Sequence, residues 1–363
     1  MPAIANRVFS LRSALAGMAL AALLSACATS GTSAPPAPGM NNPLAPSPVP
    51  TAKMLAEQEA LSKMVALQER LYKVAAPLLI NNAELCKAQA RNLLGFTAKN
   101  KYSFSDAYAE AAQNALGYGE RLQVSGVLTG SGAARAGLRK GDVLIDADGK
   151  LLPTGPNAES GAAAVFGQAI GSRATLAMTI ARGNGHQVLN VPVTRACAFR
   201  VELGNADNVN SYADGQRVML TRGMLDFAQS DQAIAYVMAA GMAHNILGHA
   251  AAQHTTATIG SIIDNLVSVH PDLSLLIGSG GMRAMAPEPD AAADHLALYL
   301  LARAGYGIEH AATFWQHLAA RYPASVLNGY VANHPGTPSR IAAINKTVAE
   351  IKARQAARTA LLP

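Results

Sequence analysis

The chain has 363 residues, of which 14% are charged, and its formal net charge is +6. That charge falls to +4 if the leader that contains Arg7 and Arg12 is removed, and it is spread thinly along the sequence. Because no basic run with interleaved aromatic residues occurs, the sequence argues against a nucleic-acid partner. It also contains no GxSxG, P-loop or dinucleotide-binding motif, which argues against those enzyme classes.

Residues 1–26 are typical of a signal peptide. A positively charged start precedes the apolar run Ser13 to Ala26, which is shorter than the roughly 20 residues that span a bilayer. The run ends in Leu24-Ser25-Ala26-Cys27, which resembles the lipobox of bacterial lipoproteins. This resemblance implies that Cys27 carries the acyl chains, and Ala28 resembles the residue that directs such proteins to the outer membrane. We expect a protein of the bacterial cell envelope, lipid-anchored and facing the periplasm; an ordinary cleaved signal peptide is the alternative.

The next two segments are expected to be a tether and a helical region. Residues 27–52 are rich in Pro, Ser, Gly and Ala and carry no charge, so they cannot bury a core. Residues 53–118 contain two helical patterns, at Lys53 to Lys73 and at Ser105 to Leu116. We expect these helices to pack with the domain that follows at residues 197–357.

Residues 119–196 are predicted to form a small β-rich domain. Arg121 to Leu128 alternates as a strand, and Thr175 to Ala181 and Val188 to Val193 are expected to form a hairpin around Gly183-Asn184-Gly185. Between them, Gly130 to Lys150, GSGAARAGLRKGDVLIDADGK, closely resembles the PDZ-domain signature. The resemblance implies that the domain adds an extended peptide to a sheet edge and holds its C-terminal carboxylate on backbone amides.

The loop Leu116, Gly117, Tyr118 and Gly119 is the candidate for that carboxylate site. Glycines in a loop also form plain turns, and this alternative stays open. The expected partners are envelope polypeptides or C-terminal peptides bound by the PDZ-like domain, together with the membrane through the lipid anchor.

Two cysteines, Cys86 and Cys197, flank the PDZ-like module. Once Cys27 is lipidated they form an even pair, and disulfides persist in an oxidising envelope. We therefore expect a disulfide that closes the base of an inserted domain, with two buried free thiols as the alternative.

Gln232 to His254 is predicted to be a largely buried helix with Asp231 as its N-cap. It contains no proline, and its polar residues collect near its end as His244, Asn245, His249 and His254. The three histidines are five residues apart, and each such step turns roughly 140° around a helix. The spacing therefore predicts that His249 does not share a face with His244 and has a structural role.

Four sequence blocks resemble the HtpX/BepA-type zinc metallopeptidases. They are Asn210 to Leu225, Tyr236 to His249, Asp290 to Asp294 with the following His295, and His334-Pro335 with Arg340. The resemblance implies an α+β fold, in which a mostly helical, zincin-like peptidase domain carries the β-rich PDZ-like domain as an insertion.

That family binds zinc through an HExxH helix and a Glu on a second helix, with the HExxH Glu as general base. By resemblance, Ala240 stands at the first ligand position, Gly241 at the general-base position and His244 at the second ligand position. Asp290 stands in place of the third ligand, one methylene shorter. For His244, a satisfied core histidine and a remaining ligand are both left open.

The resemblance also assigns supporting residues. Asp294 matches the carboxylate that orients a ligand histidine, and His334 and Arg340 are expected to support the site from outside the ligand set. The family's edge strand, which binds the substrate backbone, corresponds to Arg217, Val218, Met219, Leu220 and Thr221.

The expected function follows from what is missing at positions 240 and 241. Ala240 cannot ligate a metal, and Gly241 removes a base that contributes about 10²–10⁴ in rate. We expect a pseudo-peptidase that binds envelope polypeptides through its cleft and its PDZ-like domain, with weak or no zinc binding. The alternative is an active zinc metalloendopeptidase of envelope protein quality control that uses other ligands.

Overall fold

The computed structural model describes residues 51–171, 173–249, 287–323 and 334–363. The signal sequence with Cys27, almost all of the tether, and His254 lie outside these ranges. The described chain combines helices with sheets of mixed type, as expected for an α+β fold. Within these ranges no helix has the length and apolar character needed to cross a membrane.

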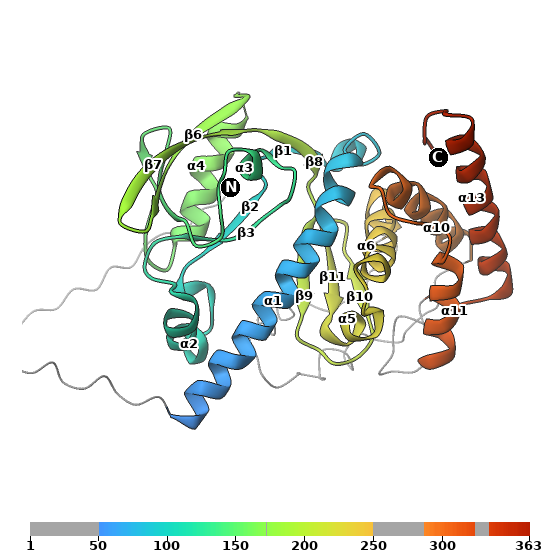
Figure 1. Ribbon diagram of the computed structural model, residues 1–363, viewed down its shortest axis with the longest axis horizontal. Coiled ribbons are helices and arrows are strands. Elements are labelled where there is room, and N and C mark those ends of the chain that lie inside the picture. Colours follow the sequence, from blue (N-terminus) through green and yellow to red (C-terminus); the bar gives the residue numbers. More distant parts are fainter. Residues whose placement is uncertain (1–50, 172, 250–286, 324–333) are drawn as a thin grey trace, which may run out of the picture. The chain divides into compact units, whose positions relative to one another are not determined.

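The β-rich part is built on one antiparallel sheet with the strand order β2-β3-β4-β6-β7, and β5 pairs with β4 (Figure 1). Its inward-facing side chains alternate along β6, where Leu176, Met178 and Ile180 are fully buried, as a sheet with one covered face requires. Helix α4 packs on β6 and contributes to the same core. The elements of this part are β2 (Phe96–Lys99), β3 (Gln123–Val127), α3 (Gly132–Arg135), β4 (Val143–Ala147), β5 (Lys150–Leu151), α4 (Ala158–Ile170), β6 (Thr175–Arg182) and β7 (Gly185–Pro192).

Two features of this sheet bear on the sequence analysis. The hairpin of β6 and β7 turns at Gly183, whose φ of 57° lies in the left-handed region that a tight turn needs. Strand β2, in contrast, precedes the expected domain start at residue 119, and α2 (Asp106–Leu116) follows it. The sheet therefore takes its first strand from a segment that we expected to be helical.

A two-stranded ribbon and a disulfide connect the β-rich part to the rest of the chain. Strand β1 (Ala90–Leu93) pairs antiparallel with β8 (Thr194–Cys197), and Ala90 lies opposite Cys197. Cys86 and Cys197 form a disulfide that closes a sequence separation of 111 residues. The expected disulfide is present. It links the segment that enters the β-rich part to the segment that leaves it.

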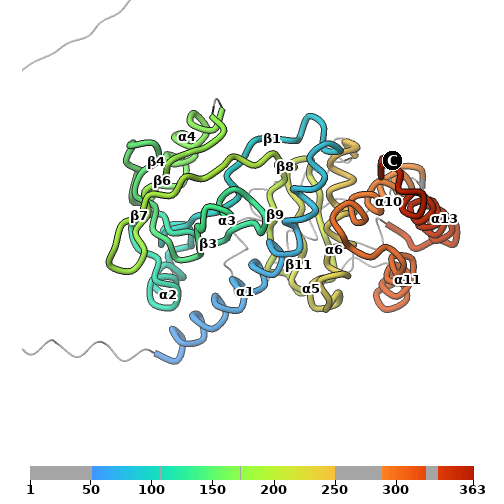
Figure 2. Tube along the Cα trace, turned by 45° about the horizontal axis from the view of Figure 1, so that its top comes forward, coloured from blue at the N-terminus to red at the C-terminus, as the bar shows by residue number. Residues whose placement is uncertain are grey.

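The second part consists of helices around a three-stranded sheet with the order β10-β11-β9. Helix α6 lies beside β10 and β11, and it also contacts α1 and α10, as Figures 1 and 2 show. Helix α13 packs on α10 and α11. The elements are α1 (Ala52–Asn81), β9 (Arg200–Gly204), β10 (Ser211–Ala213), β11 (Arg217–Thr221), α5 (Arg222–Ala228), α6 (Asp231–Ile246), α10 (Pro287–Arg303), α11 (Ala311–Arg321) and α13 (Pro338–Ala356).

Helix α6 is the buried centre of this part, and its ends differ from the prediction. Its N-cap is Ser230, whose side chain accepts a hydrogen bond from the Ala233 amide at 3.1 Å, so the assignment of Asp231 as N-cap is wrong. Asp231 is the first helical residue, where its charge is favourable at the helix N-terminus. The helix ends at Ile246, and Gly248, with φ 73°, turns the chain away.

Candidate functional site

The general-base position on α6 is closed by the neighbouring strand. Gly241 is buried, and a Cβ atom built on it would lie 2.6 Å from Cγ1 of Val218 on β11. Val218 is fully buried and β-branched, so its side chain has little freedom to move aside. Position 241 therefore lacks room even for a methyl group in the present packing, and a Glu side chain does not fit there.

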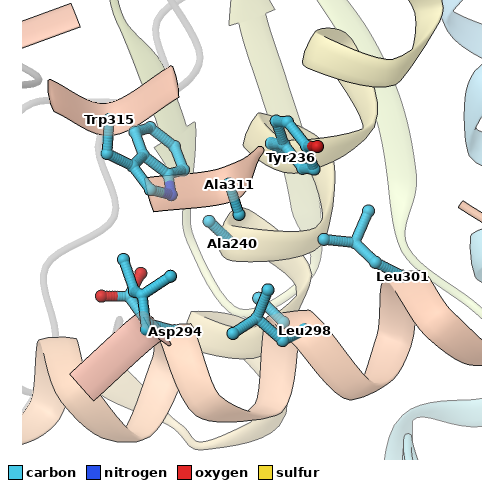
Figure 3. Close-up of a pocket in the computed structure, with 9 residues that line it drawn as sticks. Tyr236, Ala240, Asp294, Leu298, Leu301, Ala311 and Trp315 are labelled. Atoms are coloured by element: carbon cyan, nitrogen blue, oxygen red, sulfur yellow. The ribbon is translucent and has the colours of Figure 1, made fainter. Parts of the chain in front are cut away.

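The first-ligand position is also enclosed. Figure 3 shows Ala240 among Ala311, Leu298 and Asp294, and its side chain borders a cavity of about 10 Å³. A cavity of that size is at the lower limit for a single water molecule and is far smaller than an imidazole ring. Most of its other lining side chains are apolar, so this position has become part of the core.

Asn245 has a structural role at the end of α6. It is fully buried, its side-chain amide donates to the Arg217 carbonyl at 2.8 Å, and its side-chain oxygen accepts from the Gly215 amide at 2.6 Å. These bonds hold the end of α6 against the turn between β10 and β11.

The end of α6 brings two histidines together. Nδ1 of His244 and Nδ1 of His249 lie 3.0 Å apart, and the two rings meet edge to face. The prediction that His249 does not share a face with His244 is wrong, because it assumed that the helix continues to His249. Since the helix ends at Ile246 and Gly248 adopts a left-handed conformation, the chain folds back and returns His249 to His244.

Asp290 and His334 face His244 from two other segments. The Nδ1 of His334 lies 2.7 Å from Oδ1 of Asp290, and that oxygen lies 3.7 Å from Nε2 of His244. One ligand-capable atom from each of the three residues lies within 4.8 Å of the others. His334 was expected to support the ligands from outside, but it lies within the cluster of ligand-capable groups.

A buried ion pair stands behind this cluster. Arg340 donates to both carboxylate oxygens of Asp294, at 2.6 and 2.9 Å, and its remaining nitrogen donates to the His334 carbonyl at 2.9 Å. Asp294 and Arg340 are 5% and 7% exposed, so the pair is shielded from water. Asp294 was expected to orient a ligand histidine; through Arg340 it positions the backbone of His334 instead.

The charge states of the cluster follow from burial and from its neighbours. Burial, together with the nearby His334, lowers the pKa of His244 to about 3, so its ring is neutral. Burial alone would raise the pKa of Asp290, but the hydrogen bond from His334 and the charges around it lower that pKa on balance. Burial raises the pKa of Asp294 despite the opposing effect of Arg340. His244 is therefore neutral and Asp290 ionised, the forms in which they ligate metals.

The residues present fit a divalent transition metal, although not in the arrangement that the family implies. Two imidazoles and a carboxylate are a common donor set for zinc. The cluster supplies three such groups from α6, from the first turn of α10, and from the segment before α13. It supplies no replacement at position 241, so the described residues offer metal ligands without the general base expected on this helix.

The strand predicted to bind substrate does not have a free edge. Strand β11 pairs with β10 on one side and with β9 on the other, and all five of its residues are buried. The assignment of Arg217 to Thr221 as an edge strand is therefore wrong, because both of its ladders are occupied. Among the strands described, β10 ends the sheet on the side beside α6.

The loop proposed to hold a peptide carboxylate is a helix C-cap. Gly117 has φ 72°, and its amide donates to carbonyls of α2, as does the amide of Tyr118 to the Ala112 carbonyl at 3.3 Å. Tyr118 is 2% exposed and packs against Phe104 in a small core. These bonds favour the plain-turn interpretation. The backbone amides of Gly117 and Tyr118 already donate to carbonyls of α2, so they do not form a pair that could bind a carboxylate.

A second candidate for peptide binding was missed in the sequence. Strand β2 stands at the end of its sheet, and its Phe96 meets Phe166 of α4 edge to face with ring centroids 5.7 Å apart. Just before it, Gly95 adopts φ 89°, and its carbonyl accepts from the Leu128 amide at 2.8 Å. The available signal was a glycine between apolar residues directly before Phe96.

Comparisons with known proteins agree with part of this description. Residues 178–348, slightly under half of the chain, match the model of peptidase family M48. No curated protein matches the chain significantly. Among solved structures, the crystal structure of the HtrA3 PDZ domain bound to a phage-derived ligand (FGRWV) is similar to 29% of this chain and 88% of that domain, at 14% identity and a TM-score of 0.22. With so low a TM-score, the fold of the β-rich part rests on its own strand order.

Proposed function

We propose, from the match of residues 178–348 to peptidase family M48, that this protein is a peptidase-like scaffold that binds polypeptides without cleaving them. The observation that carries the proposal is the 2.6 Å approach between Val218 and a Cβ atom at position 241. A peptidase of the HtpX/BepA type needs a carboxylate base at that position. The strand packing leaves no place for it, and Ala240 is similarly enclosed by core residues.

Proteolysis by the purified full-length chain tests the loss of activity. We expect no cleavage of casein, with or without added zinc, and no cleavage by a Gly241→Glu variant, because the glutamate cannot enter the site. Cleavage by the wild-type protein that stops on chelation and in His244→Ala would contradict the proposal. That outcome would support the alternative, an active zinc endopeptidase with other ligands.

For polypeptide binding, we propose the free edge of β2 beside α4. An extended peptide adds to such an edge through main-chain hydrogen bonds, while neighbouring apolar side chains take its side chains. Phe96 of β2 contacts Phe166 of α4, and both are only partly buried, as are Val165 and Ile170 on the same helix. The Gly95 and Leu94 carbonyls are engaged with the amides of Leu128 and Ala133, so a bound carboxylate would meet the amide side of the turn.

Fluorescence anisotropy with a labelled peptide tests this edge. The probe ends in an apolar residue with a free carboxylate, and the same peptide with an amidated end serves as the comparison. We expect Phe96→Asp to weaken binding of the free-carboxylate peptide by about tenfold or more. The matched control is Val188→Asp on β7, at the opposite end of the sheet, where Val188 is 66% exposed. Equal loss in both variants, or no preference for the free carboxylate, would contradict the β2 site.

We also propose that the protein acts in the bacterial envelope, with a lipid anchor at Cys27. The proposal rests on the lipobox-like sequence Leu24-Ser25-Ala26-Cys27. Labelling with radioactive palmitate tests it, and we expect incorporation that is lost in Cys27→Ser. Equal labelling of the wild type and Cys27→Ser would contradict the lipid anchor at Cys27, and the proposed localisation would lose its support.

A further inference from the structure

Strand β7 is the last strand of the β-rich sheet and has an open edge (Figure 1). Among the strands that the structure describes, it pairs only with β6, and their register runs along its whole length without a shift. The residues from Gly185 to Val188 and Asn190 are exposed, and Leu189 is half-buried. On the side away from β6, the backbone amides and carbonyls of this stretch therefore face outward.

The open stretch ends where α3 covers the strand. Gly132, the first residue of α3, lies so close to Pro192 that a Cβ atom built on Gly132 would approach the Pro192 carbonyl oxygen to 1.5 Å. Val191, just before Pro192, is fully buried. The edge that a partner can reach is therefore residues 185–190, which is about the length of an ordinary strand.

The edge of β7 lacks the features that normally prevent strands from pairing between molecules. Proteins protect an exposed edge with charged side chains, prolines, bulges or a very short strand. Gly185 to Val191 contains no Asp, Glu, Lys, Arg or Pro, and the strand has no bulge. At the opposite end of the sheet, β2 has only 4 residues, a register shift between Thr97 and Ala98, and Lys99 at its end. Of these two edges, β7 is the one that is suited to pairing along its length with another strand.

The composition of β7 favours a second copy of this chain as the partner. When two copies of one strand pair about a two-fold axis, they run antiparallel, and each residue meets a residue of the same strand. A charged strand would then bring like charges together, which destabilises the pairing. Strand β7 carries no carboxylate, ammonium or guanidinium group. The one charged residue of the neighbouring β6, Arg182, already bonds to both carboxylate oxygens of Asp142 at 2.6 Å.

Val188 provides the apolar contact of such a pairing. Its side chain is 66% exposed, and it lies near the middle of the open stretch at residues 185–190. In an antiparallel pair of these strands, the Val188 side chains of the two copies come close together on one face of the sheet. His186 and Asn190 alternate with Val188 on the same face, and their side chains can both donate and accept hydrogen bonds across the pair.

We propose that β7 pairs with β7 of a second copy of this chain, so that the two β-rich sheets join into one antiparallel sheet in a symmetric dimer. Because one pair of strands buries less surface than a standard interface, the dissociation constant is on the order of 1–100 μM. Strand β2 ends the sheet on the other side, so the dimer keeps two open β2 edges. Pairing through β7 does not require the polypeptide binding proposed at β2.

Sedimentation velocity of the full-length chain, measured over a range of protein concentrations, tests the dimer. We expect the wild type to shift from monomer to dimer as its concentration rises. In Val188→Lys the dissociation constant should rise by about tenfold or more, because each lysine repels its counterpart in the other copy. The matched control is Leu151→Lys, which should associate like the wild type. Leu151 is 74% exposed and aligns with Val188 across the sheet through Asp146 and Thr179, but it lies on β5. Circular dichroism checks that both variants are folded.

A mixing experiment distinguishes pairing through β7 from any other association. Val188→Lys and Val188→Glu should each be largely monomeric alone and should associate when they are mixed, since opposite charges then lie close together. A wild type that stays monomeric at every concentration would overturn the dimer, and so would a mixture that does not associate or an equal loss in Val188→Lys and Leu151→Lys. A monomeric wild type whose Val188→Lys variant loses binding of the labelled peptide would instead assign this edge to an extended polypeptide. None of these results depends on Phe96→Asp, so the dimer and the β2 site are tested separately.

Discussion

At the scale of single residues, a comparison of two helical glycines distinguishes the effect of side-chain packing on stability from the effect of helix propensity. Gly241 in α6 has Val218 within 2.6 Å of a hypothetical Cβ, whereas Gly167 in α4 has nothing within 4 Å. Replacement of either glycine by alanine gains the same helix propensity, about 1 kcal/mol. Overpacking, which costs about 1–3 kcal/mol, applies only at position 241.

We therefore expect Gly167→Ala to stabilise the protein, and Gly241→Ala to be less stable than Gly167→Ala by about 1–3 kcal/mol. Chemical denaturation with a structural probe measures both free energies of unfolding. In a double-mutant cycle, Gly241→Ala should cost less in a Val218→Ala background than in the wild type, because Val218→Ala removes the atom that clashes. Equal effects of the two alanine substitutions on the free energy of unfolding would show that Val218 moves aside at little cost. The conclusion that position 241 has no room for a side chain would then be wrong.

At the scale of elements, the start of α6 is tied to α1 by charge. Asp231 accepts from Arg70 at 2.8 Å and lies 3.4 Å from Lys73, and its side chain is 40% exposed. The hydrogen bond from Arg70, helped by Lys73, lowers the pKa of Asp231 below its ordinary value of 3.8. Because the folded pKa is lowered, the stabilisation is present above the unfolded pKa and is lost as the pH falls through the folded value.

We expect Asp231→Asn to lower the free energy of unfolding by less than about 1 kcal/mol at neutral pH, since the pair is partly exposed. The difference from wild type should shrink below about pH 4, where the unfolded carboxylate becomes protonated. Denaturant titrations at several pH values measure it, with Arg70→Met and the double variant completing a cycle. Glu59→Gln on α1 is the control, because the Glu59–Lys63 pair is exposed. A deficit that persists unchanged at acid pH would exclude the ion pair as its cause.

At the scale of the whole molecule, one disulfide closes the chain where it enters and leaves the β-rich part. Cys86 and Cys197 are separated by 111 residues, and the β1–β8 ribbon continues from the same point. In the chain-entropy model, a loop of this length gives about 4–5 kcal/mol, and measured gains are often smaller. The disulfide therefore matters mainly by restricting the unfolded chain.

We expect the double variant Cys86→Ser/Cys197→Ser to lose about 2–5 kcal/mol of unfolding free energy. Thiol titration of the denatured, unreduced wild type should find neither of these cysteines free. Reduction of the wild type should produce the same loss of stability as the double variant. Two titratable thiols at these positions would show that the bond does not form.

The sequence alone determined which chemical groups are present and in what order. The side chains of Ala240 and Gly241 cannot act as a metal ligand or a general base in any fold, because they carry no group that could do so. The cysteine pair was also predictable, from the even number of cysteines that remain once Cys27 is set aside and from the oxidising compartment that the sequence leads us to expect. The hairpin of β6 and β7 followed from its turn glycines, since backbone conformation there is a local property.

Tertiary structure decided where those groups meet. His249 joins His244 because the helix stops at Ile246 and Gly248 turns the chain, a change that helical periodicity cannot anticipate. His334 reaches Asp290, 44 residues away in sequence, because Arg340 and Asp294 hold its backbone. Strand β11 has no free edge because β9 and β10 pair with it from either side. The first outcome depends on where the helix ends, and the other two depend on contacts between segments distant in sequence; residue spacing encodes neither.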